Sequence, residues 1–122
     1  MFRTALLAFV TALLFGLTPD TAEAHAIIIA SSPAPKAVVP GPDVAVKLDF
    51  NSRIDKPRSI IELIGPDAKS QHLPISDTSD AGTLATEAKG LAPGAWRLRW
   101  QVLSVDGHIT RGDIPFTVAP AP

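Results

Sequence analysis

The sequence of 122 residues contains no cysteine, no tyrosine and a single methionine, Met1. Without cysteine the chain forms no disulfide and no thiolate metal site, and it has no cysteine nucleophile. Acidic and basic residues almost balance, with a formal net charge of −1. The chain therefore has no basic surface to attract nucleic acid and no polybasic run for anionic lipid.

The first 24 residues have the layout of a secretory signal peptide. A short basic start at Arg3 is followed by an almost wholly apolar stretch, residues 4–17, and then by Ala-Glu-Ala at positions 22–24. The apolar stretch is shorter than the roughly 20 residues that cross a bilayer core. We therefore expect cleavage after Ala24, export to the periplasm, and a mature domain of residues 25–122 that is not inserted in a membrane.

The mature sequence alternates apolar and polar residues with period two and shows no convincing long amphipathic helix. Strands are predicted at residues 26–31, 44–50, 59–64, 72–75, 83–88, 95–105 and 108–118. The proline-rich segment 33–42 is expected to be irregular. About seven short strands separated by turns predict an all-β fold, an immunoglobulin-like Greek-key β-sandwich. Its core should include two stripes of alternate residues: Val44, Val46, Leu48 and Phe50, and Trp96, Leu98, Trp100 and Val102.

Cleavage after Ala24 would make His25 the first residue of the mature chain. Its α-amine and its imidazole Nδ1 can then close a six-membered chelate ring around one metal ion. Nitrogen donors in a planar arrangement suit Cu(II), which also has the highest affinity in the divalent series. The alternative is that a secreted chain begins with an arbitrary residue, so His25 alone is only suggestive.

The segment Ser104-Val105-Asp106-Gly107-His108 is a second candidate for metal chemistry. Asp-Gly between two alternating strands is a common signal for a two-residue hairpin, and on that interpretation Asp106 and Gly107 simply form the turn. The same turn would nevertheless place a carboxylate and an imidazole together at one end of the sandwich. If strand 26–31 lay near this hairpin, His25, Asp106 and His108 would offer three nitrogens and one oxygen, a set appropriate to Cu(II). His72, between turn-rich stretches, is interpreted as a surface histidine.

Several fragments together match a known family. They are His25-Ala26, residues 31–34, 46–50, 91–94 with Trp96, 100–108, Gly112 and 116–118. In this combination the mature chain resembles the CopC-type periplasmic copper-resistance proteins over nearly its whole length. The resemblance implies an immunoglobulin-like sandwich that binds Cu(II) through His25, Asp106 and His108 and passes it on. It also implies an inner-membrane copper transporter of the CopD type as a partner.

The sequence departs from that family at two places. Some members carry a methionine-rich loop for Cu(I), whereas the only methionine here is Met1, which is lost with the signal peptide. Soft thioether ligands for Cu(I) are therefore lacking. Some members also have a glutamate at the position of Ser52, so no carboxylate is expected from that loop.

Three functions are compatible with these patterns. The first, which we favour, is a non-enzymatic copper carrier or buffer in copper homeostasis or resistance. The second is a histidine-brace copper oxidase or monooxygenase, but the mature chain has no tyrosine for an axial ligand. It also has no clear flat aromatic surface for polysaccharide, because Trp96 and Trp100 fall on the predicted core stripe. The third is an immunoglobulin-like interaction module without a metal.

Overall fold

The computed structural model describes residues 26–77 and 80–120, so the predicted signal peptide and His25 lie outside the described residues. The elements are β1 (Ile28–Ser32), β2 (Ala37–Pro40), β3 (Val44–Phe50), η1 (Lys56–Arg58), β4 (Ile60–Ile64), β5 (Ser70–Leu73), β6 (Thr83–Ala88), β7 (Gly94–Leu103) and β8 (Ile109–Ala119). The predicted all-β class is confirmed. Across the described part of the chain, no helix is long and apolar enough to cross a membrane.

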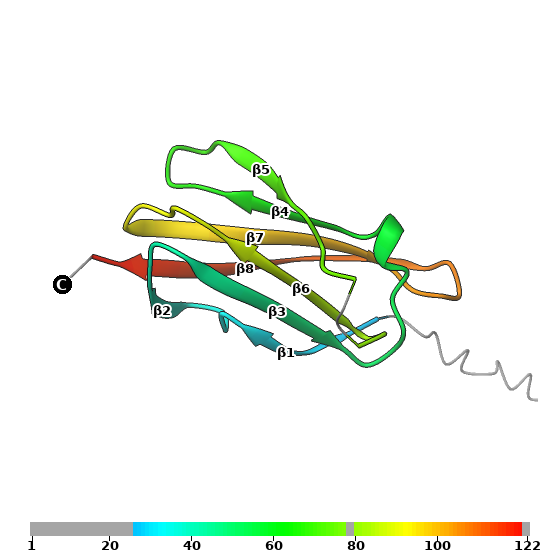
Figure 1. Ribbon diagram of the computed structural model, residues 1–122. Helices are drawn as coiled ribbons and strands as arrows, with labels where there is room; N and C mark the ends of the chain where they lie inside the picture. The colour runs from blue at the N-terminus through cyan, green and yellow to red at the C-terminus, as the bar shows by residue number, and fades with distance from the viewer. Residues whose placement is uncertain (1–25, 78–79, 121–122) are drawn as a thin grey trace, which may run out of the picture.

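The strands form two sheets that pack face to face (Figure 1). One sheet has the order β1-β3-β6 and the other the order β2-β8-β7-β4-β5. All neighbouring strands run antiparallel except β2, which pairs parallel with β8. The predicted immunoglobulin-like sandwich is confirmed, with eight strands where about seven were expected.

The core lies between the sheets and follows the predicted alternation. All four inward residues of β3 are buried, and so are Leu98, Trp100 and Val102 of β7. The rings of Phe50 and Trp100 meet edge to face across the sandwich, with centroids 5.3 Å apart. Trp96 is only partly buried at the border of the core, where its indole Nε1 donates to the carbonyl oxygen of Ala92 (2.9 Å).

The prediction for the proline-rich segment 33–42 was wrong in one respect, because it contains β2. Residues 37–40 pair with residues 116–119 of β8. β2 is an edge strand with one neighbour, so a proline at its end, Pro40, removes no hydrogen bond that an inner strand would need. A strand of only four residues among prolines gives little periodic signal, and its existence depends on pairing with β8.

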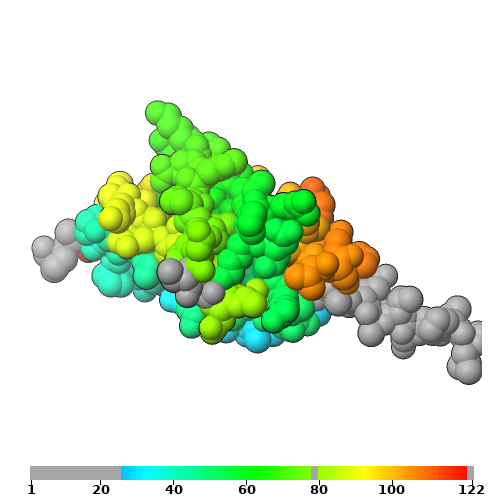
Figure 2. All heavy atoms as spheres, turned by 45° about the vertical axis from the view of Figure 1, so that its right-hand side comes forward, coloured from blue at the N-terminus to red at the C-terminus, as the bar shows by residue number. Residues whose placement is uncertain are grey.

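Three segments meet at one end of the sandwich, which we call the hairpin end: the β7–β8 connection (residues 104–108), the loop after β3 (residues 51–55), and the start of the described chain at Ala26 (Figure 1). Residues of the β7–β8 connection, in orange, form the surface there (Figure 2). The opposite end holds β2 and the start of β7.

Candidate metal site at the hairpin end

The β7–β8 connection contains a three-residue loop, residues 105–107, closed by backbone hydrogen bonds of Ser104. The amide of Ser104 donates to the carbonyl of His108 (2.9 Å), and the amide of Gly107 donates to the carbonyl of Ser104 (2.9 Å). Gly107 has a φ of 94°, in the region that favours glycine. The chain therefore turns at Val105 and Asp106 before a left-handed glycine, which is a common hairpin with a bulge. The expected two-residue Asp106-Gly107 turn was wrong.

This loop brings the two predicted ligands Asp106 and His108 together. The Nδ1 atom of His108 lies 3.1 Å from Oδ2 of Asp106. The other carboxylate oxygen, Oδ1, accepts hydrogen bonds from the hydroxyl of Ser104 and from the backbone amide of His108 (3.3 Å). These contacts lower the pKa of Asp106 to about 2. The hydrogen bond from the Ser104 hydroxyl has the largest effect, and the hydrogen bond from the His108 side chain has the second largest. The carboxylate is therefore fully ionised near neutral pH.

Ser104 holds the Asp106 carboxylate, a contact that sequence reasoning missed. It is buried, and its hydroxyl lies within hydrogen-bond distance of both the Asp106 carboxylate and the His108 carbonyl oxygen. The available signal was a serine two residues before an aspartate in a turn, since both residue types form local hydrogen bonds there. Ser104 orients the carboxylate from beneath the loop.

The start of the described chain is fastened at the same end. Ala26 is fully buried, and the amide of Ile27 donates to Oδ1 of Asn51 (2.8 Å), while the amide of Asn51 donates to the carbonyl of Ile27 (3.0 Å). Sequence reasoning gave Asn51 no role. The loop that begins at Asn51 is joined in turn to the hairpin, because the amide of Asp55 donates to the carbonyl of Leu103 (2.8 Å). One loop thus connects the segment after His25 to the hairpin.

The structure brings together Asp106 and His108, two of the three predicted ligands. His25 lies outside the described residues, so its convergence with the other two ligands stays a prediction. Within residues 26–77 and 80–120, no group of three or more His, Cys, Asp or Glu side chains is placed to hold a metal. Ser52 supplies no carboxylate, and its buried hydroxyl has no hydrogen-bond partner among the described residues.

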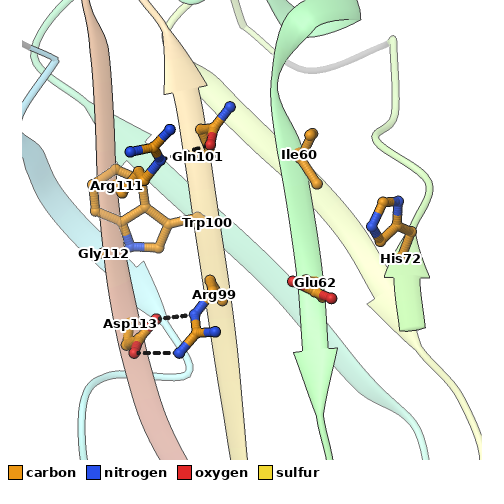
Figure 3. A pocket seen from close by; sticks show the side chains of 9 residues that line it. All are labelled: Ile60, Glu62, His72, Arg99, Trp100, Gln101, Arg111, Gly112 and Asp113. Atoms are coloured by element: carbon orange, nitrogen blue, oxygen red, sulfur yellow. Dashed lines mark hydrogen bonds and ion pairs between the residues drawn. The ribbon is translucent and has the colours of Figure 1, made fainter. Parts of the chain in front are cut away.

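His72 is exposed, as expected of a surface histidine. It lies on the edge strand β5, opposite Glu62 of β4, and both line a hollow on the outer face of the five-stranded sheet (Figure 3). Strands β4 and β7 lie between β5, which carries His72, and β8, which begins directly after His108. His72 is therefore a suitable control in tests of the site.

The CopC domain model matches residues 28–119. The chain belongs to the CopC family. It is 30% identical over 110 residues to copper resistance protein C of Xanthomonas campestris pv. juglandis, covering 84% of this chain and 86% of that protein. Among solved structures, CopC from Methylosinus trichosporium OB3b superposes with a TM-score of 0.73 at 30% identity, covering 80% of this chain and 97% of that chain. The resemblance read from the sequence is confirmed.

Another protein similar to this chain is much longer. The copper transport protein CutJ of Bacillus subtilis is 26% identical over 106 residues, which are 84% of this CopC chain but 20% of CutJ. The region similar to this chain is thus one part of a larger protein in that case.

Proposed function

We propose that this chain is a periplasmic Cu(II) carrier or buffer in copper homeostasis or resistance. Cleavage after Ala24 frees the amine of His25, and the copper is held by that amine, the His25 imidazole, Asp106 and His108. The observation that carries the proposal is that Ala26 enters the fold at the same end as the Asp106–His108 pair. Consecutive Cα atoms are about 3.8 Å apart, so a ligand at position 25 begins beside this buried residue.

The spacing of Asp106 and His108 suits a shared metal ion. Two neighbouring ligands in a square arrangement, each about 2.1 Å from a first-row metal, stand about 3.0 Å apart. In the structure, Asp106 Oδ2 and His108 Nδ1 are 3.1 Å apart. A copper ion would take the place of the proton between them. Because the carboxylate is already ionised, copper need not displace a proton from it.

Cu(II) rather than Cu(I) follows from the donor atoms. The proposed site has three nitrogens and one oxygen, which favour Cu(II), whereas Cu(I) prefers thiolate and thioether sulfur. The chain has no cysteine, and its one methionine is Met1. Competition with a strong Cu(I) chelator under reducing, anaerobic conditions should therefore remove Cu(I) from the mature protein.

The partner in copper transfer is proposed to be an inner-membrane copper transporter of the CopD type. In CutJ, the region similar to this chain is part of a longer copper transport protein. A separate chain of the same family would serve such a transporter by docking to it. The membrane protein, not this chain, then moves copper across the bilayer.

The decisive experiment compares mature protein that starts at His25 with a version extended by one residue before His25. The extension turns the α-amine into an amide nitrogen and abolishes the amine–imidazole chelate. We expect Cu(II) affinity to fall by about a hundredfold or more, because a donor held on the same residue is lost. His72→Ala should bind like the unaltered mature protein. Equal affinity of the extended and mature proteins would contradict the proposal.

Two further measurements separate the alternative functions. The mature protein with one equivalent of Cu(II) should give a tetragonal EPR signal with nitrogen hyperfine splitting, whereas an interaction module without a metal site would retain no copper after desalting. With a reductant, the copper-loaded protein should consume oxygen no faster than the same copper in buffer. Faster consumption would favour the oxidase.

A further inference from the structure

Large apolar side chains are exposed mainly at the hairpin end. Among the described residues six are exposed: Ile27, Ile29, Val38, Ile60, Val105 and Ile109. Only Val38 lies at the opposite end, where it pairs with Thr117. Single exposed apolar residues are ordinary on protein surfaces, but a group at one end indicates a surface that is covered part of the time.

Two of these side chains flank the predicted ligands directly. Val105 precedes Asp106 and is 68% exposed, and Ile109 follows His108 and is 53% exposed. Ile109 pairs with the partly buried Leu103 on the neighbouring strand. We call Leu103, Val105 and Ile109 the apolar rim. The side chains of Leu103 and Ile109 alternate with the inward residues of β7 and β8, so they point away from the core on the outer face of the five-stranded sheet. Val105 lies in the loop beyond them, where it is exposed to solvent.

The apolar rim continues into a hollow of about 460 Å³ on the same face, lined in part by Ile60, Gln101 and Arg111 (Figure 3). Arg111 lies two residues after Ile109, and its guanidinium Nε donates to the neutral amide oxygen of Gln101 (2.7 Å). It makes no ion pair with a carboxylate in the described part of the chain. By contrast, Arg97 and Arg99 both pair with Asp113. The face therefore offers an apolar surface with an adjacent cation that a carboxylate of another molecule can pair with.

We propose that the apolar rim and Arg111 form the docking surface for the membrane copper transporter that accepts the metal. This inference rests on the proposed function. Direct transfer requires the acceptor's ligands to come within bonding distance of the copper. The acceptor must then cover the side chains beside Asp106 and His108, which are those of the rim. A matching acceptor presents an apolar surface flanked by an acidic group.

The test places a photo-crosslinking amino acid at position 109, and separately at position 38, in the full-length chain made in its source cells. Val38 is a suitable control because it is an apolar residue at least as exposed as Ile109 (68% against 53%) but lies at the far end. We expect position 109 to yield an adduct with a membrane copper transporter, identified by mass spectrometry, about tenfold more than position 38 does. Arg111→Glu in the same chain should reduce that adduct.

Several outcomes would overturn the docking surface. These are equal yields at positions 38 and 109, a dominant adduct with a second copy of this chain, or no effect of Arg111→Glu. Val105→Ser combined with Ile109→Ser should keep Cu(II) affinity within about twofold of the parent protein, since neither side chain donates to the metal. Loss of affinity in that variant would assign the rim to the metal site instead. If the parent protein binds no Cu(II), the proposed function itself fails, which the titration shows independently of crosslinking.

Discussion

The hydroxyl of Ser104 lies beneath the hairpin and holds the Asp106 carboxylate in place. Ser104→Ala removes this hydrogen bond, so the pKa of Asp106 should rise towards its ordinary value and the carboxylate should lose its fixed orientation. Loss of a residue that orients a metal ligand typically weakens metal binding by 10–100-fold, and we expect about tenfold here. The measurement is a Cu(II) titration against a competing ligand.

Ser59 offers a matched control for that substitution. It is also buried, and its hydroxyl donates to the carbonyl of Asp55 (2.7 Å) and accepts from the amide of Leu103 (3.3 Å). Ser59→Ala should lower stability while leaving Cu(II) affinity unchanged. Equal losses of copper affinity in both variants would mean that Ser104 acts only through stability.

Asp113 gives a pH-dependent contribution to stability. Arg99 donates to both of its carboxylate oxygens (3.0 and 3.3 Å), and this pairing, with Arg97 nearby, lowers the pKa of Asp113. A lowered folded-state pKa stabilises the protein above the ordinary carboxyl range, near pH 4, and that stabilisation is lost as the pH falls further. Copper-free protein should therefore be more stable than Asp113→Asn at pH 7, by less than about 1 kcal/mol because the pair is solvent-exposed.

Thermal unfolding of the two proteins between pH 2 and 7 checks this prediction. The difference in Tm should narrow below about pH 4 and vanish as Asp113 is protonated. A difference that stays constant down to pH 2 would show that the carboxylate charge has no part in it.

At the scale of elements, the β7–β8 loop depends on one glycine. Gly107 has a φ of 94°, and a Cβ added there would meet nothing within 4 Å. Gly107→Ala should therefore cost about 1–2 kcal/mol through backbone conformation alone. Because the loop would shift to relieve this strain, Asp106 and His108 would separate and Cu(II) affinity would fall.

A substitution at Gly90 separates the loss of stability from the loss of Cu(II) affinity. It has a φ of 71°, equally open surroundings, and a hydrogen bond to Asp43 at the opposite end of the sandwich. Gly90→Ala should lower stability by a similar amount, measured by urea unfolding, but leave Cu(II) affinity unchanged. If both variants bind copper like the parent protein, the shape of the β7–β8 loop is not required for the site.

At the scale of the whole molecule, copper binding and folding should be coupled. The proposed ligands come from the start of the predicted mature chain and from the β7–β8 connection, so only the folded protein brings them together. At free Cu(II) of about 100 times Kd, binding should stabilise the mature protein by about 2.7 kcal/mol. For a domain of this size, that raises Tm by about 10–20 °C.

Differential scanning calorimetry with and without Cu(II) measures this shift. A chelator should reverse it, and His108→Ala should reduce it strongly. A similar rise in Tm for His108→Ala would mean that copper stabilises the fold from another site.

The sequence by itself determined the fold class and the inward faces of β3 and β7. The alternation in β3 and β7 is local, because neighbouring side chains in a strand point to opposite faces whatever the partner strand is. The sequence also singled out Asp106 and His108, since a turn between two strands keeps residues close together that are close in the chain. Strand ends were less predictable: β7 ends at Leu103 rather than at Val105.

Only the tertiary structure decided the features that depend on residues far apart in the chain. The pairing of β2 with β8 requires hydrogen bonds to a strand nearly 80 positions later, which no local pattern shows. The same holds for the attachment of Ile27 to Asn51 and of the following loop to the hairpin. These contacts bring the start of the described chain to the hairpin end, because hydrogen bonds and burial select among many arrangements that the same alternation permits.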